Sequence, residues 1–187
     1  MSRAQVTGKD VVAVFGCGMI GMGAIVAAAL RGATVVAMDI DDKKLEVAKA
    51  VGAKYTVNTA YEDVQEGISE LTNGLLADVV IEAVGLPVTQ RQAIAIVGFT
   101  GRVVFIGYAK ATTEFVTKLF VQKELDVRGS RNAKPADFRA VIHYMQQNRN
   151  YPKDELISAV AKPEEAHSAM KQWAAAPAKV FRILVEL

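Results

Sequence analysis

Glycine occupies the first, third and sixth positions of a short segment near the start of the chain, Gly16-Cys17-Gly18-Met19-Ile20-Gly21. An apolar run at residues 10–15 comes directly before this segment, and an alanine-rich stretch at residues 22–31 comes directly after it. The apolar run predicts a strand covered on both faces, and the alanine-rich stretch predicts a helix that ends at Gly32. A strand that passes through a glycine loop directly into a helix begins a parallel α/β unit, and this constrains the fold of the residues that follow.

Short apolar runs and helical patterns alternate along the rest of the chain. Further strands are expected at residues 34–39, 54–57, 78–81, 102–106 and 125–128, separated by helices at residues 43–51, 61–72, 88–97 and 115–123. The chain then continues with two expected helices, at residues 135–147 and 163–175, and a terminal strand at residues 179–187. Because parallel strands need right-handed crossovers, this order predicts an α/β fold with a Rossmann-type, doubly wound parallel six-stranded sheet in the order 3-2-1-4-5-6.

Composition limits the classes of protein that fit. The 187 residues are 51% hydrophobic and 22% charged, with no internal linker, so we expect a single globular domain over residues 1–187. The net charge of +2 has no basic cluster that would bind nucleic acid. No apolar stretch reaches the roughly 18 residues of a membrane span, and the start lacks a secretion signal. The only cysteine, Cys17, excludes an internal disulfide, and a cytoplasmic location is expected.

Each glycine of the loop has its own expected role. Gly16 allows the tight turn that leaves the strand, and Gly18 lets a pyrophosphate approach the backbone. Gly21 lets the helix pack closely on the sheet. The helix also offers unpaired N–H groups and its positive dipole end to phosphates. The alternative is a plain strand-turn-helix unit that binds nothing.

Asp39 follows Gly21 by 18 residues and ends the second expected strand. A carboxylate at this position can accept hydrogen bonds from both hydroxyls of an adenosine ribose, and it would repel a 2′-phosphate. The sequence therefore favours NAD over NADP. Alternatively, Asp39 caps the next helix, although Asp41 and Asp42 are better placed to do so. Lys43 and Lys44 weaken the preference slightly, since a nearby cation could tolerate a phosphate.

Two more strand ends are expected at the same edge of the sheet, and their glycines would let the backbone approach a cofactor or simply end the strands. They are Ala83-Val84-Gly85 and Ile106-Gly107-Tyr108. Catalytic groups and metal ligands are not evident. His143 and His167 lie on separate expected helices, and Cys17 lies in the glycine loop, where a metal ion would block phosphates. No Tyr-x-x-x-Lys pair and no Ser-His-Asp set can be assigned.

The chain resembles the medium-chain, zinc-dependent alcohol and polyol dehydrogenases over nearly all of its length. The resemblance rests on the glycine loop, Asp39 and residues 78–85, 101–107, 123–130 and 179–180. It covers the carboxyl-terminal half of a usual family member. A narrower similarity lies in residues 128–133, followed by Asp137-Phe138. This segment resembles that of the branch that acts on sugar alcohols and sugar acids, such as sorbitol and galactonate dehydrogenases.

The resemblance implies a cofactor site but no catalytic residue and no metal ligand in this chain. The implied cofactor-binding residues are Gly16, Gly18, Met19, Ile20, Gly21, Asp39, Ile40, Lys44, Ala83, Val84, Gly85, Ile106, Gly107 and Arg131. Zinc is expected only in a preceding catalytic domain that these residues do not include. The parent enzyme would transfer hydride from a secondary alcohol of a polyol or sugar acid to NAD, and the isolated chain would be inactive.

The resemblance also implies that the terminal strand, residues 179–187, returns to the catalytic domain. Without that domain we expect the strand to pair with another copy or to be disordered, and the sixth strand, at the sheet edge, is a second candidate for a homodimer contact. Two other functions stay open. One is a regulatory nucleotide-sensing Rossmann domain, and the other is an S-adenosylmethionine-dependent methyltransferase.

Overall fold

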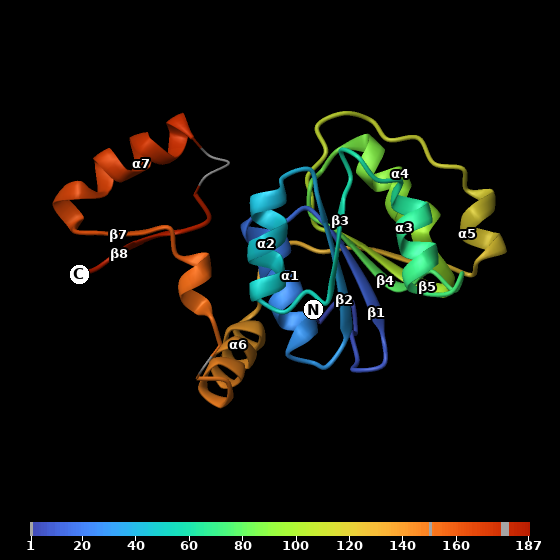
Figure 1. Ribbon diagram of the computed structural model, residues 1–187, viewed down its shortest axis with the longest axis horizontal. Helices are drawn as coiled ribbons and strands as arrows, with labels where there is room; N and C mark the ends of the chain where they lie inside the picture. Colours follow the sequence, from blue (N-terminus) through green and yellow to red (C-terminus); the bar gives the residue numbers. More distant parts are fainter. Residues whose placement is uncertain (1, 150, 177–179) are drawn as a thin grey trace.

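The computed structural model describes residues 2–149, 151–176 and 180–187. A parallel six-stranded sheet in the order β3-β2-β1-β4-β5-β6 forms its main part, as the sequence predicts (Figure 1). The strands are β1 Val11–Phe15, β2 Thr34–Asp39, β3 Tyr55–Asn58, β4 Ala77–Glu82, β5 Val97–Phe105 and β6 Asp126–Gly129. The helices that connect them are α1 Met19–Ala29, α2 Asp42–Ala50, α3 Val64–Leu71, α4 Pro87–Ile96 and α5 Lys118–Gln122.

The register of the sheet brings the carboxyl ends of its strands to one edge. Phe15, the last residue of β1, pairs with Met38 of β2 and with Glu82 of β4. Glu82 pairs in turn with Phe105, which pairs with Gly129 at the end of β6. The chain leaves β1 toward β2 on one side and reaches β4 on the other, so the topological switch point lies at β1. Ligands of open parallel sheets bind at this point, beyond the carboxyl ends of the strands.

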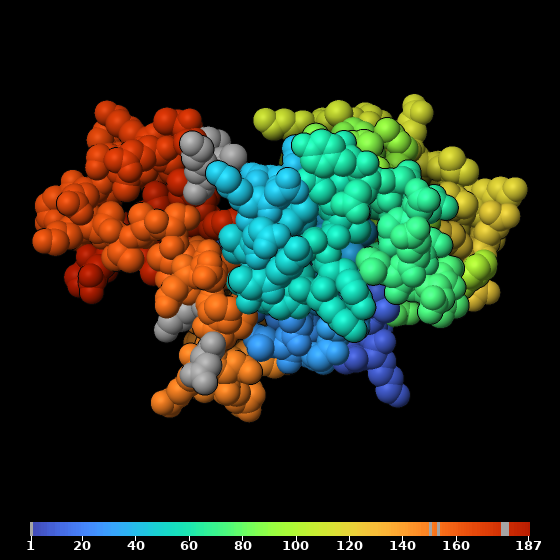
Figure 2. All heavy atoms as spheres, in the orientation of Figure 1, coloured from blue at the N-terminus to red at the C-terminus, as the bar shows by residue number. Residues whose placement is uncertain are grey.

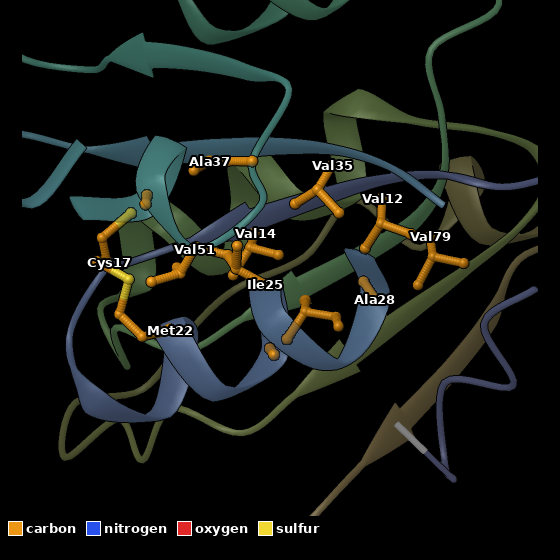
Figure 3. Packing of buried hydrophobic residues seen from close by; sticks show 14 of the residues in the cluster. Val12, Val14, Cys17, Met22, Ile25, Ala28, Val35, Ala37, Val51 and Val79 are labelled. Carbon is orange, nitrogen blue, oxygen red and sulfur yellow. The ribbon is translucent and has the colours of Figure 1, made fainter. Parts of the chain in front are cut away.

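The core consists of two apolar layers, one on each face of the sheet. Alternate residues of β1 point to opposite faces, so Val12 and Val14 enter one layer while Ala13 and Phe15 enter the other. In the first layer, shown in Figure 3, the side chains of Met22, Ile25 and Ala28 of α1 pack toward the sheet, and α2 adds Leu45 and Ala48. Helices α3 and α4 cover the second layer.

Some of the expected boundaries are wrong. Helix α1 begins at Met19 rather than at residue 22, so Gly21 lies inside its first turn. Helix α3 begins at Val64 rather than at residue 61, because the carboxylate of Asp63 accepts hydrogen bonds from the backbone N–H groups of Gln65 and Glu66 and caps the helix there. The helix expected at residues 163–175 divides into a 3-10 turn, η2 Pro163–Glu165, and α7 Ala166–Ala175.

The residues after β6 form a second, smaller group of elements. Helix α6 Pro135–Gln147 and the 3-10 turn η1 Lys153–Leu156 lead to β7 Ala159–Ala161, which was not predicted. The last strand is β8 Ile183–Val185. In Figure 2 the residues after α6, in orange to red, gather on one side of the molecule beside α2, in cyan. The described helices include none that is long and apolar enough to cross a bilayer.

The terminal strand differs from the prediction. It covers three residues, and residue 179, where we expect it to begin, lies outside the described part of the chain. Strand β8 pairs in parallel with β7 of the same chain. The expectation that this strand is disordered is therefore wrong for Ile183–Val185, whereas its pairing with another copy through the other edge stays a prediction. The pairing supplies partners for the backbone N–H and C=O groups along one edge of the strand, but the side chains of Leu184 and Val185 remain 42% and 45% exposed.

An ion pair joins Asp10, which directly precedes β1, to Arg102 of β5. Arg102 donates a hydrogen bond of 2.5 Å from Nη2 to Asp10 Oδ1, and its Nη1 donates to the carbonyl oxygens of Ala4 and Gln5. The side chains of Arg102 and Asp10 are only 20% and 10% exposed. We expect Arg102→Met to lower the free energy of unfolding by about 2 kcal/mol, because it leaves a nearly buried carboxylate without its partner.

Urea unfolding measures this loss. Lys49→Met is the matched control, because it removes the exposed Lys49–Glu46 pair, whose side chains are 49% and 71% exposed. That change should stay within about 0.5 kcal/mol of the parent chain. Equal losses in the two variants would contradict the structural role of the Arg102–Asp10 pair.

Candidate functional site: the loop after the first strand

The turn between β1 and α1 depends on glycine at two positions. Gly16 has a φ of +88°, which L residues with side chains rarely adopt, and its N–H donates to the carbonyl oxygen of Met38 at 2.8 Å. At Gly21 an added Cβ would lie 1.6 Å from the carbonyl oxygen of Gly16. Any side chain there would drive α1 away from the turn. Both expected roles are found, and at Gly21 the closest neighbour is the backbone of the loop itself.

Gly18 is in a different environment. It precedes α1 as its N-cap residue, with an ordinary φ of −75°, and an added Cβ would meet no atom within 4 Å. Space, rather than backbone conformation, is what this glycine provides. Helix α1 has no side-chain cap and no acidic residue in its first turn, so its first N–H groups have no intrahelical or capping partner. Met19 is half-buried beside them and Ile20 is 57% exposed.

Asp39 faces the glycine loop. Its Oδ2 accepts a hydrogen bond of 2.7 Å from the N–H of Cys17, and its Oδ1 accepts from the N–H groups of Ile40 and Asp41 at 2.8 and 3.1 Å. The alternative that Asp39 caps α2 is wrong, because Asp41 does so by accepting from the N–H of Lys43 at 2.9 Å. The carboxylate therefore joins the end of β2 to the loop after β1, and it stays partly exposed.

Two further predicted residues, Ile40 and Lys44, lie in the segment from the end of β2 to the first turn of α2. Ile40 follows Asp39 and is 70% exposed at the rim of the loop. Lys44 is half-buried in the first turn of α2, close enough for its charge to lower the pKa of the Cys17 thiol. A cation is thus present beside the glycine loop.

The single cysteine is inert by its environment. Cys17 is fully buried, and burial, followed by the negative charge of Asp39, raises the pKa of its thiol from 9.0 to about 12. The thiolate, which is the form that binds metals and attacks electrophiles, is therefore scarce at neutral pH. Among the residues that the structure describes, no group of three or more His, Cys, Asp or Glu side chains could hold a metal ion.

The ends of β4 and β5 lie against each other and beside the loop. Gly85 has a φ of +81°, and an added Cβ would lie 2.8 Å from the N–H nitrogen of Tyr108. An added Cβ at Gly107 would lie 2.2 Å from the nitrogen of Gly85. The two glycines thus allow two backbones to touch. Val84 reaches back to the glycine loop, since its Cγ2 lies 2.8 Å from the Cβ position of Gly16.

A cavity of about 590 Å³ opens at the ends of β5 and β6. Its lining residues are Phe105, Ile106, Gly107, Tyr108, Gly129, Ser130 and Arg131. It therefore joins three of the predicted residues, and Arg131 at its rim is exposed. His143 and His167, by contrast, are exposed on α6 and α7 and form no part of this cavity.

One buried acidic side chain at this edge was missed by the sequence reasoning. Glu82, the last residue of β4, is fully buried, and its carboxylate accepts hydrogen bonds from the N–H groups of Val84 and Gly85. A signal was present in the sequence. An acidic residue inside a run otherwise made of Val, Ile and Ala, three residues before a glycine, is unusual for a strand covered on both faces.

Comparison with known proteins agrees with this arrangement. The sequence model of the zinc-binding dehydrogenase family matches residues 20–147. A sorbitol dehydrogenase of Halalkalibacterium halodurans is 31% identical over 176 residues, which cover 91% of this chain and 51% of that protein. The crystal structure of 2R,3R-butanediol dehydrogenase from Bacillus subtilis superimposes with a TM-score of 0.88 at 28% identity, over 100% of this chain and 53% of that one.

A third comparison concerns the fold alone. An Escherichia coli protein described as a short chain alcohol dehydrogenase, solved with NADH, has a TM-score of 0.89 at 22% identity and matches 100% of this chain and 55% of its own. The chain spans about half the length of the curated relatives it matches.

The chain belongs to the zinc-binding dehydrogenase family and corresponds to the NAD-binding domain of its medium-chain members. This confirms the resemblance and decides against both the methyltransferase and the nucleotide-sensing alternatives. The 187 residues do not include the catalytic zinc domain of that family.

The two loop glycines predict losses of stability of very different size for the same substitution. We expect Gly21→Ala to lower the free energy of unfolding by about 3 kcal/mol or more, because the methyl group cannot fit against the carbonyl of Gly16. Gly18→Ala should cost about 1 kcal/mol at most, because its surroundings are open and only the weaker N-cap preference of alanine acts. Urea titration of both variants measures the difference, and similar losses would show that the turn is packed differently.

The Cys17 thiol predicts a pH dependence of stability. The folded chain keeps the thiol protonated up to a pKa of about 12, whereas the unfolded chain ionises it from about 9.0. Its contribution is therefore complete below pH 9 and is lost as the pH rises toward 12, at up to about 1.4 kcal/mol per pH unit. We expect the difference in unfolding free energy between the parent chain and Cys17→Ala to shrink from pH 8 to pH 10 in urea titrations. A difference that stays constant over this interval would contradict the buried, neutral thiol.

Proposed function

We propose that the chain binds NAD(H) along the carboxyl edge of the sheet, across the switch point at β1. The pyrophosphate lies over Gly18, Met19 and Ile20, against the open N–H groups of α1. The adenosine ribose lies at Asp39, with Ile40 and Lys44 beside it. The observation that carries the proposal is the hydrogen bond from Cys17 N–H to Asp39, since it places a partly exposed carboxylate next to an uncapped helix start.

The nicotinamide half then extends to the other side of β1. The backbone at residues 83–85 and Ile106-Gly107 lines that side, and the cavity at the ends of β5 and β6 continues from it toward Arg131. We assign Arg131 to the cofactor or to the substrate bound next to it, because it is exposed at the cavity rim.

In the whole protein we propose hydride transfer between a secondary alcohol of a polyol or sugar acid and the nicotinamide. The sorbitol dehydrogenase relative supports this substrate class. Zinc, bound outside these residues, would polarise the alcohol oxygen. We propose that the chain alone binds the cofactor without turnover, and a dehydrogenase assay of the isolated chain with added zinc tests this. A cytoplasmic location belongs to the same proposal.

A homodimer through the edge of the sheet is also proposed. Strand β6 is the last strand of the sheet on its side, and Val127 in it is 37% exposed. At the outer edge of β6 the carbonyl oxygen of Gly129 accepts from Arg3 Nε at 3.2 Å, and the other outward N–H and C=O groups can pair with the same strand of another copy. Sedimentation equilibrium tests this, and a monomer at all concentrations would contradict it.

Titration calorimetry with NADH and NADPH tests the cofactor site. We expect the parent chain to bind NADH at least tenfold more tightly than NADPH, because Asp39 accepts from the ribose hydroxyls and repels a 2′-phosphate. Asp39→Asn should weaken NADH about tenfold, the loss expected for a charge-assisted hydrogen bond, and should narrow the preference over NADPH. Gly18→Ala should weaken both cofactors, since its methyl group occupies the approach to the loop.

Asp63→Asn is the matched control for the loss of one carboxylate. Asp63 caps α3 on the other face of the sheet, and asparagine caps a helix equally well. The control should bind both cofactors like the parent chain. No measurable binding of NADH by the folded parent chain would refute the proposed function.

A further inference from the structure

Glu82 is a buried acidic residue at the carboxyl end of β4, between the ends of β1 and β5. Its side chain is fully inaccessible, and its Cα pairs with Phe15 of β1 on one side and Phe105 of β5 on the other. The remainder of β4 is apolar apart from Asp78 near its beginning. Burying an ionisable group in a sheet costs free energy unless its hydrogen bonds are satisfied, and an apolar residue would fill the same space without this cost.

The hydrogen bonds of Glu82 connect two backbones. Its Oε1 accepts from the N–H of Val84 at 2.9 Å, from the N–H of Gly85 at 2.8 Å and from the Thr89 hydroxyl at 2.9 Å. Its own carbonyl oxygen accepts from the N–H groups of Ile106 and Gly107 at 2.8 and 2.9 Å. One residue thus holds the turn after β4 with its side chain and the turn after β5 with its main chain.

The second oxygen of the carboxylate fixes the distance between these turns. Glu82 Oε2 is buried and has no hydrogen-bond partner among the described residues. It lies 2.7 Å from the position of a Cβ at Gly107, in the same place where Gly85 and Gly107 touch. The carboxylate therefore lies between the two turns and limits how closely they approach each other.

These turns lie on the side of β1 opposite Asp39. If the adenosine ribose lies at Asp39, on the β2 side, the switch point directs the other half of the dinucleotide to the β4 and β5 side. Val84 is 42% exposed and Tyr108 is 85% exposed, so each of the two turns presents a side chain to the cleft.

We propose that Glu82 is a positioning residue for the nicotinamide ring of NAD(H), holding the turns after β4 and β5 at the separation that this ring requires. The inference rests on the proposed cofactor function. Glu82 itself touches no ligand, because it is buried, and it acts through the backbone that it binds.

Paired titrations with NADH and ADP-ribose test the proposal. ADP-ribose contains the adenosine, the pyrophosphate and the second ribose and lacks only the nicotinamide, so a loss of NADH affinity without a loss of ADP-ribose affinity assigns the effect to the nicotinamide ring. For Glu82→Leu we expect NADH affinity to fall about tenfold or more, and ADP-ribose affinity to stay within twofold of the parent chain. Glu82→Gln keeps an oxygen that can accept from Val84, Gly85 and Thr89, so it should stay within threefold for both ligands. The fluorescence emission of bound NADH, which reports the nicotinamide environment, should shift in Glu82→Leu.

A milder variant keeps the test decisive if Glu82→Leu does not fold. Thr89→Val removes the hydroxyl whose single proton is shared between Glu82 Oε1 and the carbonyl oxygen of Leu86, each at 2.9 Å, and it should weaken NADH about threefold without changing ADP-ribose. Thr72→Val is its matched control, because Thr72 is a buried threonine whose hydroxyl donates to the carbonyl of Ile68. It lies at the end of α3, before β4 begins, whereas the turn that Glu82 holds follows the other end of β4. The control should leave both affinities unchanged.

The outcomes distinguish a failure of the positioning role of Glu82 from a failure of the cofactor site. Equal weakening of NADH and ADP-ribose in folded Glu82→Leu or Thr89→Val, or no weakening of either, would overturn the positioning role while the cofactor site stands. A loss in Glu82→Gln as large as in Glu82→Leu would overturn it as well. If the folded parent chain binds neither ligand, the proposed function fails, and the role of Glu82 fails with it.

Discussion

The contact between the first turn of α1 and the carbonyl of Gly16 is the constraint on which the cleft depends. Because Gly21 has no side chain, the helix can begin almost against the end of β1. Its uncapped N–H groups are then held at the carboxyl edge of the sheet, where the register aligns the ends of the neighbouring strands. Moving the helix outward by the size of a methyl group would separate the loop from Asp39, whose hydrogen bond to Cys17 N–H is 2.7 Å long.

Two carboxylates at strand ends have different tasks because their burial differs. Asp39 uses its oxygens on three N–H groups of its own and the neighbouring loop but remains partly exposed, so lone pairs are left for a ligand. Glu82 is fully enclosed and binds only protein donors. The first can recognise a bound molecule directly, whereas the second can act only through the backbone it holds.

Local patterns explain why most of the sheet and much of the site could be predicted. The glycine spacing, the apolar runs and Asp39 each reflect a requirement within a few residues, and the strand order follows from right-handed crossovers. Glu82 could not be assigned, because its role depends on Gly107, 25 residues later, and on a contact between two turns. Strand β7 was missed for the same reason, since its three residues gain their only ladder from β8.

Stability and site chemistry are concentrated in the same part of the chain. Helix α1 buries five residues, whereas α6 buries none and α7 buries only Ala169. Burial of apolar surface is the main favourable term in folding, so the elements after β6 add little to the core that supports the cleft. The residues that line the cleft come from the ends of β1, β2, β4, β5 and β6, which are joined through their ladders. The ends of the paired strands therefore present the site, and α6, α7 and the β7–β8 pair add none of the described residues to the hydrogen bonds between Asp39 and the glycine loop.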